Sequence, residues 1–195
     1  MPRIVSRPGT INSKIVNLTT GATTSFGAGF ISGNDSKAPT VSNINGRIIT
    51  KLYIDLEGNT SKNTIKDIIG NDSGGAAYIY RHVNSINGMV SNIYMTCIET
   101  PTTGDDDIDL VGSTAGTGAY DTDYSTLASG GMILEAGAGW EIGVTRELPT
   151  GAANGASSQM NMNNFYLYLA SGNGDTAGEY GAGKFIITIV GQETF

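Results

Sequence analysis

The chain has very few of the residues that most often carry chemistry in enzymes. Its 195 residues include one cysteine (Cys97), one histidine (His82) and one tryptophan (Trp140). A single cysteine excludes an intrachain disulfide, and a single histidine leaves little material for a Ser-His-Asp or Cys-His catalytic set. No serine lies in a G-x-S-x-G elbow. We therefore predict a protein that is not an enzyme and has no catalytic residues. In it His82 is a packing or surface residue and Cys97 a buried, inert thiol.

Long apolar runs and clusters of basic residues are also missing. No apolar run approaches the ~18 residues that a membrane-spanning helix needs, and Met1 is not followed by the apolar segment of a secretory signal. The 11 Lys and Arg residues are isolated and do not interleave with aromatic side chains. We expect the chain to bind neither membranes nor nucleic acids.

The charges that are present are unevenly distributed along the chain. Residues 1–81 hold nine basic and five acidic side chains, a balance of +4, whereas residues 82–195 hold two basic and thirteen acidic ones, a balance of −11. The two balances sum to the net charge of −7. If this asymmetry survives in space, a positive and a negative side of the subunit can sit against copies of itself or against an acidic lattice.

What the chain does contain is glycine, with 28 residues scattered between short β-rich runs. Glycine supplies the turns that link antiparallel strands, and eight to ten such strands fit a jelly-roll-like antiparallel β-sandwich with long Gly/Ser/Asn-rich loops. We expect an extended N-terminal arm over residues 1–10 and a single all-β sandwich domain over residues 11–195. In the arm, the candidate docking residues are Arg3, Ile4, Val5 and Arg7.

Several local patterns give sharper predictions. Alternation over residues 48–56 predicts a half-buried strand, and residues 164–170 predict another. The nearly all-apolar run 184–190 predicts a central strand that is buried on both faces. Other predictions are a hairpin at Asn87-Gly88 between strands 76–83 and 90–99, one helical turn within 64–69, and a polar, turn-rich segment over 32–46.

An acidic run, DDDIDL over residues 105–110, is the one candidate metal site. Clustered carboxylates can supply the oxygens that calcium needs, so Asp105, Asp107 and Asp109 are weak calcium candidates, and Asp121 and Asp123 are possible additions. The spacing does not match an EF-hand loop. Because charge runs are usually solvated, a solvated loop with no cofactor is the favoured interpretation.

Five segments together resemble a protein family found in tailed bacteriophages of marine bacteria. They are KLYIDLEG (51–58), KDIIGNDSGGAAYI (66–79), MTCIETPTTGDDDIDL (95–110), FYLYLASG (165–172) and GEYGAGKFIITIVG (178–191). The resemblance spans residues 48–191 and implies a virion structural protein, with no catalytic residues to carry over. From it we expect a capsid decoration or cement protein on the exterior of the phage head, made in the host cytoplasm. Its partners would be copies of itself, as a homotrimer, and the major capsid protein.

Alternatives from other classes stay open. One is a calcium-assisted carbohydrate- or receptor-binding β-sandwich module, and another is a tail or neck component of the virion. A small hydrolase that uses a carboxylate pair is disfavoured, because Trp140 alone gives poor aromatic support for a sugar cleft. In the decoration protein, loops 112–131 and 149–164 are expected to face solvent or the host.

Overall fold

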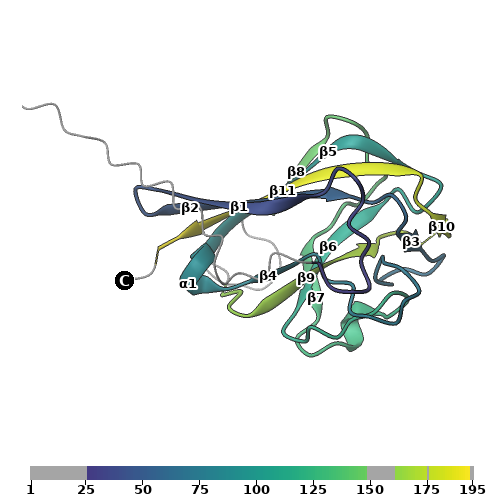
Figure 1. Cartoon of the computed structure of the whole chain (residues 1–195), viewed down its shortest axis with the longest axis horizontal. Helices are drawn as coiled ribbons and strands as arrows, with labels where there is room; N and C mark the ends of the chain where they lie inside the picture. The colour runs from purple at the N-terminus through teal and green to yellow at the C-terminus, as the bar shows by residue number, and fades with distance from the viewer. Residues whose placement is uncertain (1–25, 149–160, 175, 194–195) are drawn as a thin grey trace, which may run out of the picture.

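The chain folds into two packed antiparallel β-sheets, seen as an upper and a lower layer in Figure 1. The computed structural model describes residues 26–148, 161–174 and 176–193. The five-stranded sheet has the order β1 (Lys37–Ile44), β2 (Arg47–Asp55), β11 (Ala182–Gln192), β5 (Met89–Thr102), β8 (Thr145–Glu147). The four-stranded sheet has the order β4 (Tyr80–His82), β9 (Phe165–Ser171), β6 (Ile108–Ser113), β7 (Gly131–Leu134).

Three short elements complete the described structure. A two-stranded ribbon pairs β3 (Thr60–Ser61) with β10 (Gly178–Glu179), at the right-hand end in Figure 1. The one-turn helix α1 (Asn84–Asn87) lies at the opposite end, and a 3₁₀ turn, η1 (Tyr124–Thr126), follows β6. Within the described residues, no helix is long and apolar enough to cross a membrane.

The prediction of an all-β antiparallel sandwich is confirmed. The chain passes back and forth between the layers, from β2 to β4, back to β5, on to β6 and β7, then to β8, β9 and β11. As a result β11, near the C-terminus, pairs with β2 along nine residues. The finer jelly-roll designation stays a prediction, with which this alternation between sheets agrees.

The core lies between the inner faces of the two sheets. Leu52, Ile93 and Ile187 project from the five-stranded sheet and are almost fully buried, as are Leu110 and Leu169 from the four-stranded sheet. Burial of this apolar surface is the main stabilising contribution to such a sandwich. The strand predicted at residues 48–56 is confirmed as β2, with Ile48, Thr50, Leu52 and Ile54 turned inward and buried.

The two other strong strand predictions are correct in position but not in burial. The run 184–190 lies in β11, which is central between β2 and β5, yet Ile186 and Thr188 on its outer side are only half-buried. Conversely, β9 matches the strand predicted at 164–170, but Tyr168 on its outer side is fully buried. The outer faces of the two sheets therefore differ.

The predicted hairpin at Asn87-Gly88 is wrong. The two strands on either side of it, β4 and β5, belong to different sheets and are joined by α1. The Asn87 side chain is buried, where it donates to the Tyr80 hydroxyl at 2.7 Å and to Thr50 Oγ1 at 2.9 Å. A two-residue hairpin is found instead at Asn45-Gly46, where both residues have positive φ (54° and 81°), as a type I′ turn requires.

Two further local predictions are corrected. Residues 64–69 form no helical turn, because the segment pairs with β9: the amides of Lys66 and Ile69 donate to the carbonyls of Ser171 and Leu169, both at 2.9 Å. The segment 32–46, expected to be turn-rich, contains β1, which pairs with β2 despite its polar composition. In both cases a distant strand supplies the backbone hydrogen bonds, and this overrides the local preference.

The loop 112–131, expected to face solvent, packs partly on the outer face of the four-stranded sheet. The Tyr168 hydroxyl donates to the Ala115 carbonyl at 2.6 Å and accepts from the Gly118 amide at 3.3 Å. A Cβ at Gly118 would lie 2.6 Å from Ile68 Cδ1, so a larger residue here would displace neighbouring side chains. This loop buries the outer side of β9.

Candidate interaction surface

The acidic run is not a solvated loop, because three of its aspartates are buried. Asp105, Asp107 and Asp109 are almost fully buried, and only Asp106 between them is exposed. The carboxylate of Asp105 accepts from the amide of Asp107 at 3.0 Å and from the amide of Gly174 at 2.8 Å. Carboxylates that accept backbone N–H groups satisfy donors that would otherwise be buried without partners.

Asp109 fastens a second loop to the sheet. Its carboxylate accepts from the Ala136 amide at 2.7 Å, and burial, opposed by that bond, raises its pKa to about 6. Within residues 26–148, 161–174 and 176–193, no group of three or more His, Cys, Asp or Glu side chains is arranged to hold a metal ion. The carboxylates of Asp105 and Asp109, two of the three calcium candidates, hold loops in place.

Asp121 and Asp123, the possible additions to the calcium site, each contact a residue outside the acidic run. The backbone of Asp123 forms an isolated antiparallel β-bridge with the backbone of Asp67, and the Asp121 carboxylate forms an ion pair with the Lys62 ammonium group at 3.4 Å. Burial, reinforced by the charge of Asp121, raises the pKa of Asp67. These contacts brace the 66–70 segment against the loop after β6.

The single histidine, cysteine and tryptophan are packing residues. His82 is fully buried in β4, its Nδ1 donates to the Met162 carbonyl at 3.2 Å, and burial lowers its pKa to about 4. Cys97 is buried in β5, which confirms the prediction, and burial raises the pKa of its thiol. Trp140 packs edge-on against Phe185, and its Nε1 donates to the Ile108 carbonyl at 2.8 Å. None of these groups lies at an exposed reactive site.

One convex feature stands out on the described surface: the turn Glu141–Val144, which we call the Ile142 turn. Ile142 at its tip is 70 % exposed, the highest value among the exposed large hydrophobic residues. The turn closes with the Val144 amide donating to the Glu141 carbonyl at 3.1 Å, and Gly143 has φ +87°, as a type II turn requires. The neighbouring Ile98 on β5 is 41 % exposed.

The Ile142 turn is held firmly. The Gly143 amide donates to the Cys97 carbonyl, and the Cys97 amide to the Val144 carbonyl, both at 2.9 Å. Just beyond, Arg146 lies over the Trp140 ring at 4.3 Å and donates to the Ala138 carbonyl at 2.8 Å. Ile142 is therefore presented to solvent by a rigid support.

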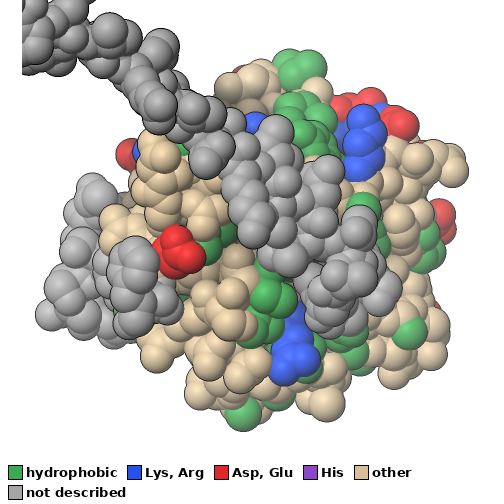
Figure 2. All heavy atoms as spheres, turned by 60° about the vertical axis from the view of Figure 1, so that its left-hand side comes forward, with side chains coloured by type: hydrophobic (Ala, Val, Ile, Leu, Met, Phe, Trp, Pro, Cys, Tyr) green, Lys and Arg blue, Asp and Glu red, His purple; other side chains and the backbone are tan. Residues whose placement is uncertain are grey.

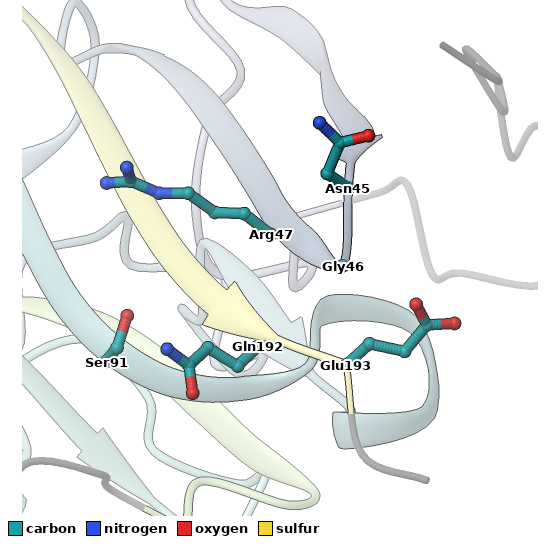
Figure 3. A pocket seen from close by; sticks show the side chains of 6 residues that line it. All are labelled: Asn45, Gly46, Arg47, Ser91, Gln192 and Glu193. Atoms are coloured by element: carbon teal, nitrogen blue, oxygen red, sulfur yellow. The ribbon is translucent and has the colours of Figure 1, made fainter. Parts of the chain in front are cut away.

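One concave feature lies at the tip of the β1–β2 hairpin, and we call it the hairpin pocket. It has a volume of about 540 Å³. Figure 3 shows its lining side chains on three strands and the hairpin: Asn45, Gly46, Arg47, Ser91, Gln192 and Glu193. The Arg47 side chain extends across β11, whereas the Glu193 carboxylate points away from it (Figure 3) and accepts from Asn43 Nδ2 at 3.3 Å. The polar groups do not converge on one point, as a catalytic site would require.

The hairpin pocket is lined by charges of both signs, those of Arg47 and Glu193. Arg47 in the pocket makes no ion pair within the described residues, whose ion pairs involve only Lys62 and Lys184. Glu141 of the Ile142 turn is likewise exposed and unpaired among them. Elsewhere charge is sparse: Figure 2 shows a face on which blue and red side chains are scattered among uncharged ones.

Comparisons of the chain with protein-family models, with curated proteins and with solved structures find no match. The candidate docking residues Arg3, Ile4, Val5 and Arg7 lie outside the described residues. Sequence reasoning missed both the Ile142 turn and the hairpin pocket. The dipeptide Asn45-Gly46 is a turn signal that identifies the position of the hairpin but not the pocket beside it, and the sequence gives no comparable signal at Ile142.

Proposed function

We propose that the chain is a structural subunit of a bacteriophage virion. Its role would be that of a capsid decoration or cement protein on the exterior of the head, which stabilises the lattice by non-covalent contacts and catalyses no reaction. Many copies at symmetry-related positions multiply weak contacts, so a modest affinity per copy is enough to clamp neighbouring subunits.

The observation that carries this proposal is where the five resembling segments lie in the fold. Segments 51–58, 95–110 and 178–191 contain much of β2, much of β5 and β11 up to residue 191, which are adjacent in one sheet, and 165–172 covers β9 in the other. The Tyr180 hydroxyl joins two of the segments by donating to the Asp105 carbonyl at 2.7 Å. The residues that carry the resemblance therefore lie mainly in the strands of the two sheets.

The proposal includes partners. Copies of the chain would associate, with a trimer as the expected state at threefold positions of the lattice, and the major capsid protein would be the surface beneath them. The N-terminal arm, through Arg3, Ile4, Val5 and Arg7, would dock on the lattice. Residues 149–164 and the exposed residues of loop 112–131 would face solvent or the host.

The test is to mix the purified chain with undecorated capsids of the source phage. We expect it to co-sediment with the shells and to raise their rupture temperature, and removal of residues 1–10 to weaken binding. A second variant, the full chain with Arg3 and Arg7 changed to Gln, keeps the length of the arm and measures how much of its binding depends on charge. Equal binding by the truncated chain would remove the arm's role.

Two outcomes would overturn the decoration role. A chain that does not bind capsids but binds glycans in a calcium-dependent way would be a receptor-binding module. A chain that co-sediments with purified tails or necks and not with shells would be a component of those structures.

A further inference from the structure

We propose that the outer face of the five-stranded sheet, the upper layer in Figure 1, packs against the same face of a second copy about a two-fold axis parallel to the strands. The inference goes beyond the proposed function and does not rest on the virion role. It adds a two-fold contact to the threefold association expected there. We call this surface the open face and define it by six side chains: Lys51 and Tyr53 of β2, Ile186 and Thr188 of β11, Tyr94 of β5 and Glu147 of β8.

One cross-strand row of the open face has opposite charges at its two ends. In the register of the sheet, Lys51 lies beside Thr188. Thr188 lies beside Tyr94, which lies beside Glu147. Neighbouring strands are about 4.8 Å apart, so the two charged residues are roughly 14 Å from each other. Both are exposed, and neither takes part in an ion pair of the described residues.

The other charges of the sheet follow the same division. Lys37 of β1 and Arg47 of β2 are exposed on the basic side, and they too make no ion pair among the described residues. In the middle of the sheet, Lys184 of β11 is neutralised by Asp35 at 2.9 Å and Glu99 at 3.0 Å. The charge asymmetry of the sequence therefore survives across this face, from β1 and β2 to β8.

A two-fold axis parallel to the strands makes this row complementary to itself. With the axis over the middle of the row, Lys51 of each copy lies at the Glu147 end of the other copy's row, and two equivalent ion pairs form. An axis across the strands would instead stack each strand on its own equivalent and bring like charges together. The charge pattern therefore favours one symmetric arrangement, in which both copies use the same surface.

The centre of the open face is apolar and needs no new polar partner. Tyr53 lies beside Ile186 in one adjacent row, Ile49 of β2 lies in the row on the other side, and all three are half-buried. The Tyr94 hydroxyl already accepts from Asn92 Nδ2 at 2.9 Å, so covering it leaves no donor or acceptor unsatisfied. An apolar, tyrosine-containing centre between charged margins is typical of specific interfaces.

The open face is also large enough for a specific contact. β2, β11 and β5 are nine, 11 and 14 residues long, and β8 lies beside them. At about 3.3 Å per residue and 4.8 Å per strand, they present a surface of about 600 Å² per copy. Specific interfaces begin at about this size. The outer face of the four-stranded sheet offers no such surface, because the 112–131 loop covers Tyr168 there.

The test measures the association of the purified full chain by light scattering and sedimentation. We expect the wild type to contain an even number of copies. Lys51→Glu and Glu147→Lys should each weaken association by about tenfold or more, because each brings like charges together twice per pair of copies. The matched control is Lys66→Glu, which makes the same change in net charge at an exposed site on the segment that pairs with β9. Thermal unfolding checks that each variant is folded.

Mixing the two charge variants tests the symmetry. In a mixed pair, one contact joins the two substituted sites and the other joins the two native ones, so both contacts again join opposite charges. An equimolar mixture should therefore recover the wild-type number of copies. A folded mixture that does not recover it would overturn the proposal, as would a control variant that dissociates as much as Lys51→Glu.

Failure of this inference can be told apart from failure of the virion role. A wild-type chain that is monomeric or contains only an odd number of copies, or oligomers that survive both charge reversals, would overturn the two-fold contact whether or not the chain binds shells. Copies that pair and separate as expected, from a chain that binds no part of the virion, would overturn only the virion role.

Discussion

The outer faces of the two sheets are built from similar strands but have opposite environments. On the four-stranded sheet, Tyr168 of β9 is fully buried beneath the 112–131 loop, and Asp109 of β6 is buried as well. On the five-stranded sheet, Tyr94 of β5 and Thr188 of β11 remain half-exposed. The covered face contributes to stability, and the open face leaves surface for partners.

The largest expected effect comes from matched tyrosines on the two faces. Tyr168→Ala should lower the free energy of unfolding by about 3–5 kcal/mol, because it leaves a cavity under the loop. Tyr94→Ala should cost less than about 1 kcal/mol, since its site is open to solvent. Denaturant unfolding of both variants measures the difference, and equal losses would show that the two faces are equivalent.

The pH dependence of the free energy of unfolding tests the burial of His82 in the four-stranded sheet. Burial lowers its pKa to about 4, below the ordinary histidine value of 6.5, so the folded state resists its protonation. The contribution of His82 to the free energy of unfolding is complete above pH 6.5. It is lost as the pH falls toward 4, because the unfolded state is protonated there first. Between pH 7.5 and 4.5 the loss is on the order of 2 kcal/mol. His82→Gln should remove it, as measured by unfolding at both pH values; an unchanged pH dependence would mean that His82 titrates normally.

Asp109 should act in the opposite direction over the same range. Its pKa is raised from 3.8 to about 6, so the folded state binds a proton more tightly than the unfolded state. The folded state is then penalised as the pH rises from 4 to 6, by on the order of 1–2 kcal/mol. Asp109→Asn, which keeps the acceptor for the Ala136 amide, should raise stability at pH 7.5 more than at pH 4.5. Asp106→Asn is the exposed control, and a similar gain from it would count against a specific effect of burial.

The smallest effect is expected on the open sheet. Lys184 of β11 bridges Asp35 at 2.9 Å and Glu99 at 3.0 Å, and these carboxylates raise its pKa. Surface ion pairs are screened by solvent and salt, so Lys184→Gln should change stability less than any substitution above, and less still at high salt. Unfolding at low and high salt measures this. A loss as large as that of Tyr168→Ala would show that the open face is not dispensable for folding.

The all-β class and the position of several strands could be predicted because period-two alternation is local. The alternating pattern over residues 48–56 corresponds to strand β2, and the apolar run 184–190 lies within strand β11. The choice of hairpin could not be predicted. The chain has Asn-Gly at both 45–46 and 87–88, and the second became a crossing between sheets because Asn87 is held by Tyr80 and Thr50.

The candidate site shows the same division. The run of aspartates is evident in the sequence, but its burial depends on amides from Gly174 and Ala136, which are 69 and 27 residues away. The same residue types with no distant donors would be solvated.

By itself, then, the sequence determined a β-rich, glycine-punctuated chain that has little material for catalysis, because composition and alternation are properties of neighbouring residues. Only the tertiary structure decided which sheet face is covered and where the carboxylates find their donors. Each of these depends on backbone groups brought together from distant parts of the chain.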